Sequence, residues 1–259
     1  MVSEAEVLPR RATTGWAATG WVATGRGFRT FLGASLAVTV LSSTAQEPDH
    51  RELEVGEFHS VRFTGPGVIR LTQGPVARLS ARGTEQALAN VEVTTHDGTL
   101  HIRIDDSAAA PSGPVPTLVL QVASLTELIG DGTGRIVGQG LEVESLRLVG
   151  NGSGSFELQG LEANELIVEG RGATRFELTG QVGRQSVHLS GTGAYDAAGL
   201  ISNSTRVNVA GASSVRLWAD ERLDVEVAGA ADIRYAGSPR VAQRITGVAS
   251  VQRIAQIVI

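Results

Sequence analysis

Three acidic residues recur at nearly constant spacing in the second half of the chain. Glu157, Glu177 and Asp196 are separated by 20 and 19 residues. If the stretches that carry them stack as neighbouring strands, their carboxylates lie about 4.8 Å apart. A retaining glycosidase uses two carboxyl groups about 5 Å apart, and such a cluster can also hold a cation. This acidic row is therefore the first candidate for chemistry.

Arginines around the acidic row favour a different interpretation. Arg175 lies diagonally across from Glu157 in the expected stack, and further arginines flank the row at Arg135, Arg216 and Arg234. Exposed ion pairs form readily on such a surface, whereas acid–base catalysis needs partial burial to shift pKa values. We therefore expect ion pairs along the row, and a site for a ligand or cation stays open as the alternative.

The other polar residues lack the spacing of a site. The histidines do not have the paired spacing of metal ligands; they are His50, His59, His96, His101 and His188. Asp131 and Asn151 occupy equivalent positions and could share calcium, but Arg171 follows in the same position. A solvated acidic edge is indicated by Glu142, Glu144, Glu162 and Glu165. We predict no catalytic, cofactor-binding or metal-ligating residue, and no cofactor.

Regularly spaced glycines define the elements that carry these side chains. They recur at steps of 18 to 20 residues, at Gly132, Gly152, Gly172, Gly191, Gly211, Gly229 and Gly247. Each lies between two short stretches of alternating apolar residues. A repeat of this length with strand-period alternation is typical of a β-solenoid, in which each coil buries its apolar side against its neighbours.

Aligning the repeats on these glycines gives columns of similar residues. Four residues before each glycine stand Leu128, Leu148, Val168, Val187, Val207 and Val225, with Gln243 as the exception. Four residues after it stand Ile136, Phe156, Phe176, Tyr195, Val215, Ile233 and Val251. Both columns share the parity of the glycine and point inward. The acidic row and Trp218 have the opposite parity and point outward. Because the other aromatic column points inward, Trp218 has no aromatic neighbours on the outer face, which weakens a sugar-binding interpretation without excluding it. Each glycine is a tight corner between two strands.

The pattern is less regular before residue 117. Residues 61–71 repeat the alternation, residues 84–90 fit a short helical turn, and His96-Asp97-Gly98 is a hairpin signal. Residues 107–116 form a loop rich in Ala, Pro, Ser and Gly. The fold class predicted is all-β, a parallel right-handed β-helix or β-solenoid with coils of 18–20 residues. Residues 46–259 form its single domain, with 46–116 as an irregular N-terminal cap and 117–259 as regular coils.

Residues 1–45 read as a secretory signal peptide. Arg26 and Arg29 precede an apolar run over residues 31–41, and Ser43-Thr44-Ala45 provides small residues before cleavage at Gln46. A run of about 11 residues is too short for a membrane span, which needs roughly 20. The chain has no cysteine, so lipid attachment at the cleavage site is excluded.

The charge of the processed chain limits its partners. Removing four arginines and two glutamates from 22 basic and 27 acidic residues leaves 18 − 25 = −7. This mildly acidic balance argues against nucleic acid and against an anionic membrane surface as partners.

Several motifs together resemble one bacterial family. They are GDGTGRIVGQG, GNGSGSFELQG, SGTGAYDAAG and GAADIRYAGSPRV, preceded by EFHSVRFTGPGVIRLTQG and HDGTLHIRI. This order is similar to that of the head GIN domain family, labelled auto-transporter adhesins, over residues 58–254. The resemblance implies an extracytoplasmic right-handed β-helix-like solenoid and supplies no catalytic residue or ligand. The chain departs from lipoprotein relatives in lacking cysteine, and its last three corners lose the second glycine.

The sequence as a whole predicts an exported, non-enzymatic, adhesin-like module. It would act at the cell surface, in the periplasm or outside the cell, on a glycan or protein of unknown identity, and an oligomer is compatible with the pattern. The alternative is a polysaccharide lyase or glycoside hydrolase, because parallel β-helices also carry such enzymes.

Overall fold

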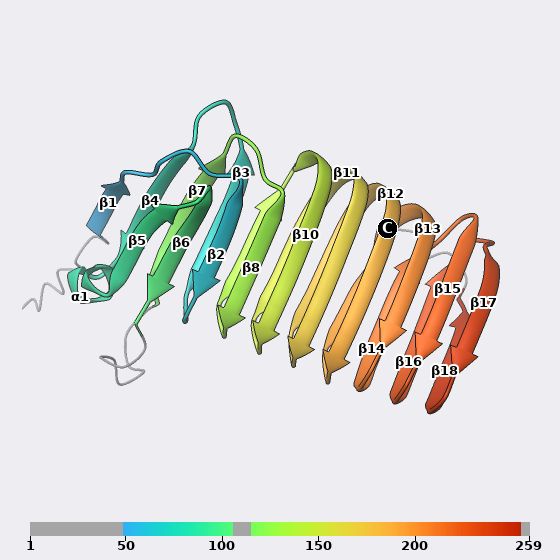
Figure 1. Ribbon diagram of the computed structural model, residues 1–259. Coiled ribbons are helices and arrows are strands. Elements are labelled where there is room, and N and C mark those ends of the chain that lie inside the picture. Colours follow the sequence, from blue (N-terminus) through green and yellow to red (C-terminus); the bar gives the residue numbers. More distant parts are fainter. Residues whose placement is uncertain (1–48, 106–114, 255–259) are drawn as a thin grey trace, which may run out of the picture. The chain divides into compact units, whose positions relative to one another are not determined.

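The protein folds into one row of stacked strands. The computed structural model describes residues 49–105 and 115–254, so the predicted signal peptide and most of the loop at 107–116 lie outside the described residues. Among the described residues, 73% lie in strands and 3% in helix, and the strands form a β-solenoid. Figure 1 shows the strands side by side along one axis. The predicted all-β solenoid is therefore confirmed.

Each turn, or rung, contributes strands to two parallel ladders. The regular rungs contain β8 (Glu127–Gly132), β9 (Arg135–Gln139), β10 (Glu142–Gly152), β11 (Ser155–Gly172), β12 (Arg175–Gly191), β13 (Ala194–Val209), β14 (Ala212–Trp218), β15 (Arg222–Val227), β16 (Ala230–Ala236), β17 (Arg240–Ile245) and β18 (Val248–Arg253). The first ladder runs β8–β10–β11–β12–β13–β15–β17 and the second runs β9–β11–β12–β13–β14–β16–β18. The long strands β11, β12 and β13 bend around the coil and belong to both.

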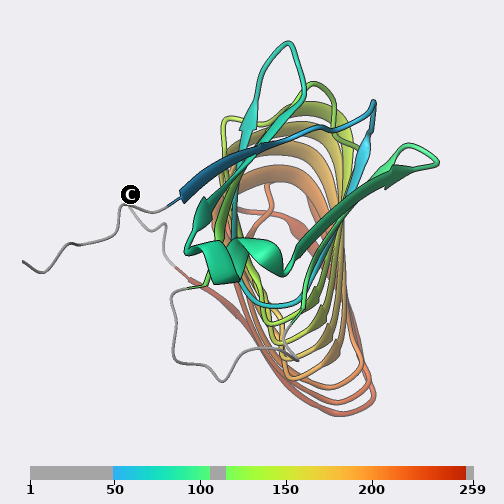
Figure 2. The same ribbon diagram turned by 90° about the vertical axis from the view of Figure 1, so that its left-hand side faces the viewer.

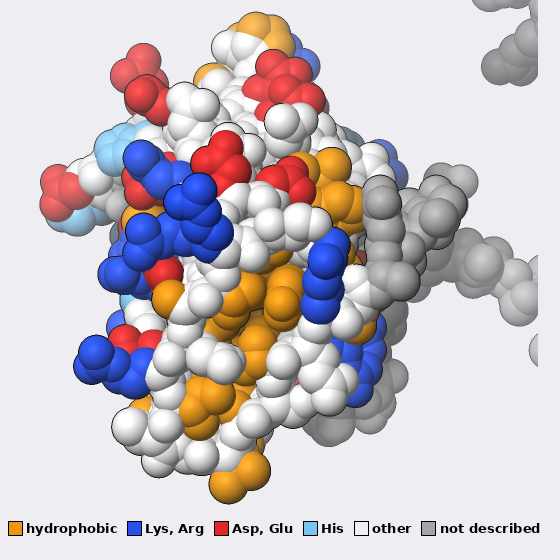
Figure 3. Space-filling model, turned by 90° about the vertical axis from the view of Figure 1, so that its right-hand side faces the viewer, with side chains coloured by type: hydrophobic (Ala, Val, Ile, Leu, Met, Phe, Trp, Pro, Cys, Tyr) orange, Lys and Arg blue, Asp and Glu red, His pale blue; other side chains and the backbone are white. Residues whose placement is uncertain are grey.

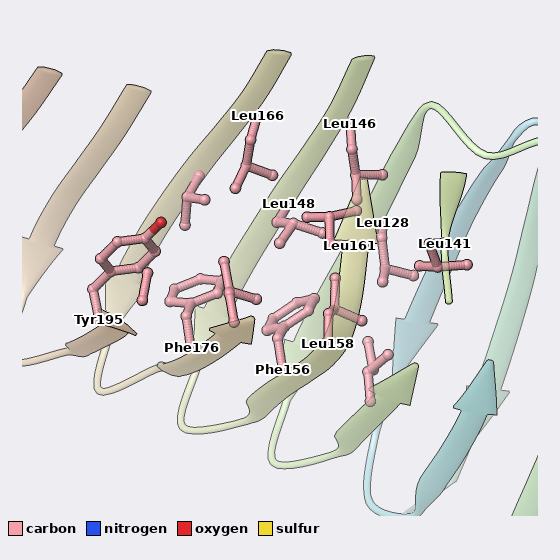
Figure 4. Packing of buried hydrophobic residues seen from close by; sticks show 14 of the residues in the cluster. Leu128, Leu141, Leu146, Leu148, Phe156, Leu158, Leu161, Leu166, Phe176 and Tyr195 are labelled. Atoms are coloured by element: carbon pink, nitrogen blue, oxygen red, sulfur yellow. The ribbon is translucent and has the colours of Figure 1, made fainter. Parts of the chain in front are cut away.

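The register places the predicted columns in line. Phe156 pairs with Phe176, which pairs with Tyr195, and all three are buried. The two phenylalanine rings stack with centroids 5.0 Å apart. Figure 4 shows these rings in a row against the leucines of the facing strands. Columns of similar side chains thus form one continuous core along the solenoid.

The N-terminal strands do not stack in chain order. Here the structure has β1 (Asp49–Leu53), β2 (Ser60–Thr64), β3 (Val68–Gln73), β4 (Arg78–Gly83), α1 (Glu85–Ala89), β5 (Val91–His96), β6 (Thr99–Ile104) and β7 (Thr117–Val122). β2 pairs in parallel with both β6 and β8, and β3 with both β7 and β9. The β2–β3 unit is therefore a regular rung between the β6–β7 and β8–β9 rungs. The order of the rungs at this end therefore differs from their order in the sequence.

Non-repetitive elements cover the N-terminal end of the stack (Figure 2). Helix α1 begins after Thr84, whose hydroxyl accepts a hydrogen bond from the Ala87 amide, and Leu88 is buried. β4 pairs antiparallel with β1 and β7, so the parallel ladder ends there. The predicted hairpin joins β5 to β6, with positive φ at Asp97 and Gly98. No helix in the described part of the chain is long and apolar enough to cross a membrane.

The corner glycines are required by close contact between rungs. Gly152 has φ of +118°, and a Cβ on it would lie 2.7 Å from the Gly132 carbonyl oxygen. Gly140 also has positive φ, +61°, but a Cβ there would meet nothing within 4 Å. Gly140 is therefore constrained by its φ angle alone, whereas Gly152 is constrained by its φ angle and by contact with the preceding rung.

Replacing Gly152 is expected to cost much more than replacing Gly140. Gly152→Ala should lower the free energy of unfolding by about 3 kcal/mol or more, because strained φ and overpacking against backbone add together. Gly140→Ala should cost about 1 kcal/mol, from φ alone. Urea unfolding followed by circular dichroism measures both. Equal losses would contradict the role assigned to rung contact.

Candidate functional site

The acidic row lies on the outer face of the second ladder. Glu157, Glu177 and Asp196 are register partners on β11, β12 and β13, so the structure brings them together as the spacing predicts. Each faces an arginine. Arg135 Nε donates to Glu157 Oε1 at 2.7 Å, Arg216 Nη1 lies 3.1 Å from Asp196 Oδ2, and Arg175 Nη1 lies 3.9 Å from Glu177 Oε1.

These contacts confirm the expected ion pairs and change one partner. Arg175 pairs with Glu177 of its own strand, whereas the diagonal geometry predicted Glu157. Arg234, also named as a flanking arginine, pairs with Asp232 at 2.9 Å. Because a cation would have to displace an arginine from each carboxylate, the row is better suited to ion pairing than to metal binding.

The outer face of the first ladder carries a second charge network. Arg147 on β10 donates to Glu127 on β8 and to Glu169 on β11, with Nη2 at 2.7 Å from Glu169 Oε1. Hydrogen bonds to Glu169 and then to Glu127 raise the pKa of Arg147 above its ordinary value. Arg171 Nη2 lies 3.1 Å from the second oxygen of Glu169. The network thus ties three successive strands together.

Asp131 and Asn151, the candidate calcium ligands, belong to the same network. Arg62 of β2 lies 3.0 Å from Asp131 Oδ2, and Asn151 Nδ2 donates to Asp131 Oδ1 at 2.7 Å. Arg171 Nη1 is 3.5 Å from Asn151 Oδ1. Protein donors therefore occupy the oxygens that calcium would need, and this geometry supports structural pairing at both residues.

The histidines lie apart or in small surface pairs. His96 Nε2 is 3.0 Å from Asp97 Oδ2, and both side chains are more than four-fifths exposed. His188 contacts Ser186 Oγ at 3.1 Å and Asn208 Nδ2 at 3.2 Å. His59 lies against the hairpin turn at Gly98. Within residues 49–105 and 115–254, no three His, Cys, Asp or Glu side chains group closely enough to hold a metal ion.

The expected acidic edge lies on the third side of the coil, where the chain passes from one ladder to the other. Glu142 of β10 is the register partner of Glu162 of β11, and Gln73 exchanges two hydrogen bonds with the Glu142 backbone, at 2.8 and 3.0 Å. Glu142 and Glu162 line an open depression with Gln181 and Asn203. The lining also includes Val143, Ala163 and Val182, and its polar side chains are spread along the stack, as expected of a solvated edge.

A buried polar network inside the coil has no counterpart among the sequence predictions. Tyr195 Oη donates to Gln185 Oε1 at 2.6 Å, and Gln185 Nε2 donates to Ser202 Oγ at 2.9 Å. Ser202 Oγ also lies 2.8 Å from Thr205 Oγ1 and donates to the Trp218 carbonyl at 2.6 Å. Gln185 and Thr205 stand in a column otherwise made of Leu146, Leu166, Leu223 and Val241. A polar break in that inward column is the signal that could have revealed the network.

Fold and surface together define a parallel β-solenoid whose outer faces carry ion-paired columns. Residues 57–239 match the family described as "Putative auto-transporter adhesin, head GIN domain", so the chain belongs to this family. The predicted family resemblance is confirmed. No curated protein matches the sequence.

Solved structures share the fold. A "putative adhesin" from Bacteroides fragilis superimposes with a TM-score of 0.75 at 24% identity, covering 81% of this chain and 98% of that chain. A "putative lipid binding protein" from Parabacteroides distasonis gives 0.63 at 20% identity, covering 81% and 98%. A "putative adhesin" from Parabacteroides distasonis gives 0.58 at 18% identity, covering 80% and 97%. At these identities the comparison establishes the solenoid fold alone.

Tyr195 is expected to make stability depend on alkaline pH. Burial raises the pKa of Tyr195 above its ordinary value of 10.0, so the unfolded chain loses this proton first. The stabilising contribution is complete below pH 10 and is lost as pH rises toward the folded-state pKa, by about 1.4 kcal/mol per pH unit. Tyr195→Phe should remove that part of the slope, measured by urea unfolding between pH 8 and about pH 11.

A double-variant comparison separates the hydroxyl from simple packing. At neutral pH, Tyr195→Phe should cost about 1–3 kcal/mol, because Gln185 Oε1 loses its donor in the core. Adding Gln185→Leu, the residue type of its register partner Leu166, should cost less than the sum of the single changes. Strict additivity would show that the network does not couple the two side chains.

Proposed function

We propose that this protein is an exported, non-enzymatic, adhesin-like module that binds a glycan or protein of the cell envelope or its surroundings. Membership of a family described as adhesins supports the adhesive role. The predicted signal peptide supports export, and the absence of cysteine argues against a lipid anchor at the cleavage site. The mildly acidic processed chain supports a partner other than nucleic acid or an anionic membrane.

The observation that carries the proposal is the layout of the two ladder faces. Outward side chains stand in columns at the strand spacing of about 4.8 Å, and arginines pair with the carboxylates of the acidic row. Such a face presents many polar groups in one plane, as an extended ligand requires. Acid–base catalysis would instead need carboxyl groups converging in a partly buried cleft.

One pair on the second ladder is the most open to a ligand. Arg175 and Glu177 are 3.9 Å apart, with side chains 64% and 52% exposed. By contrast, Arg135 holds Glu157, whose side chain is only 21% exposed. Because the Arg175–Glu177 pair is long and solvated, its members exchange partners at little cost. We therefore place the contact surface around this pair.

Export is tested by the site of cleavage. The protein recovered from the periplasm or culture medium should begin at Gln46, as read by N-terminal sequencing. Val38→Arg should keep the chain unprocessed in the cell, because a charge in the apolar run blocks insertion. Arg10→Ala should leave export unchanged, because Arg10 lies about 20 residues before the apolar run. An unprocessed wild-type chain in the cytoplasm would contradict the proposal.

Binding is tested on an array of glycans and envelope proteins. For whichever ligand the wild type retains, Arg175→Ala with Glu177→Ala should weaken binding about tenfold, equivalent to about 1.4 kcal/mol. The matched control is Arg222→Ala with Asp224→Ala, a same-strand pair two residues apart like Arg175 and Glu177 but on the other ladder, which should bind like the wild type. An incubation with a polysaccharide panel should release no product. Turnover of a polysaccharide would favour a lyase or hydrolase. Equal losses of binding affinity in both double variants would reject the assignment of the contact surface to the Arg175–Glu177 pair.

A further inference from the structure

The C-terminal end of the solenoid exposes residues that every inner rung buries. In β15, the inward residues Leu223, Val225 and Val227 are 0%, 3% and 0% exposed. In the next strand, β17, their register partners are Val241, Gln243 and Ile245. Val241 is 40% exposed and Ile245 is 37% exposed. Figure 3 shows this end, with apolar side chains open to solvent across its centre.

The backbone at this end also has an open hydrogen-bonding edge. The backbone N–H groups of Arg240 and Thr246 donate hydrogen bonds to the backbone carbonyls of Glu221 and Val227 in the preceding rung, at 2.9 and 2.8 Å. In a parallel ladder, alternate residues bond to one neighbour and the residues between them face the other side. The groups facing outward therefore belong to Val241, Gln243 and Ile245 in β17 and to Ala249, Val251 and Arg253 in β18. Among described residues, β17 pairs with β15 and β18 pairs with β16, with no strand beyond either.

The opposite end cannot accept this edge as another rung. Helix α1 and the strands β1, β4 and β5, which continue the sheet there in antiparallel pairing, cover it (Figure 2). Head-to-tail stacking of copies would produce an open filament, and this covering blocks it. The remaining self-association joins two C-terminal ends around a two-fold axis.

We propose that two copies of this chain dock through their C-terminal ends, each pairing β17 and β18 antiparallel with the same strands of the second copy. Gln243 and Val251 are both four residues from the corner at Gly247. A two-fold axis through these two positions therefore places both strand pairs in register at once. Every rung of the pair then has a neighbour on both sides.

The side chains of β17 suit this register. Antiparallel pairing about Gln243 sets Val241 opposite Ile245, so apolar side chains meet over the exposed core. On the outer side, Arg244 of one copy lies opposite Ala242 of the other. No like charges stand directly opposite each other in this arrangement.

The edge itself supplies a selective variant. Gln243→Pro removes an N–H that faces the open side, a position at which an edge strand tolerates proline. Gln243→Ala keeps the N–H and serves as the matched control. Protein purified from cells expressing the complete chain should show the mass of a dimer by light scattering for the wild type and Gln243→Ala. Gln243→Pro should show about half that mass, with an unchanged β-sheet circular dichroism spectrum.

A single cysteine tests the register, because the native chain has none. Gln243→Cys should form a disulfide-linked dimer under mild oxidation, since directly opposed residues have Cα atoms about 5.5 Å apart, within disulfide range. Arg240→Cys should not, because the two copies of residue 240 would lie about 20 Å apart along the paired strands.

The alternative occupant is the chain's own segment at residues 255–259. A wild-type monomer at all concentrations would overturn the proposal. A monomer that dimerises once residues 255–259 are deleted would assign the edge to that segment, and would equally overturn it. Cross-linking of Arg240→Cys in place of Gln243→Cys would reject the register. The dimer does not depend on the ligand, so failure of either test leaves the other interpretable.

Discussion

The hydrogen bonding of each rung to the next is the constraint on which the rest of the structure depends. Parallel strands lie about 4.8 Å apart, so every backbone corner must repeat the path of the corner before it. At Gly152 and Gly172, a Cβ would lie within 2.7 Å of the preceding corner's carbonyl oxygen. Glycine is selected there by a neighbouring rung as much as by its own φ angle. The glycine therefore recurs in the sequence once per rung, because each corner contacts the one before it.

The same spacing determines which side chains can occupy a column. Inside the coil, a polar residue next to leucine needs partners on adjacent rungs, because an unpaired polar group in the core is costly. Gln185, Tyr195 and Ser202 meet this requirement jointly across neighbouring rungs. Outside, carboxylates stacked at strand spacing repel each other, and arginines such as Arg147 offset that repulsion by spanning two strands. Ion pairs on the ladder faces are thus a consequence of the repeat.

Sequence spacing predicted the features that are periodic or local. The glycine columns, the α1 turn capped by Thr84 and the Asp97-Gly98 hairpin each depend on residues close in the chain or on a fixed interval. The placement of β2 between β6 and β8 could not be predicted, because parallel pairing across tens of residues leaves no local signal. The partner of Arg175 was also missed, since strand twist and rotamer decide between a diagonal and a same-strand carboxylate.

A stack of similar rungs has two ends. At each end, the apolar core and the open backbone edge must be covered by something other than another rung of the same chain. At the N-terminal end, antiparallel strands and α1 break the repeat, so Leu88 and its neighbours cover the core. At the C-terminal end the columns continue to the last strand, and Gln243 is the first interruption of an otherwise apolar column. Pairing of two such ends would place the ladder faces of two copies in one dimer. For a surface module, two linked faces allow weak individual contacts to hold an extended ligand through avidity.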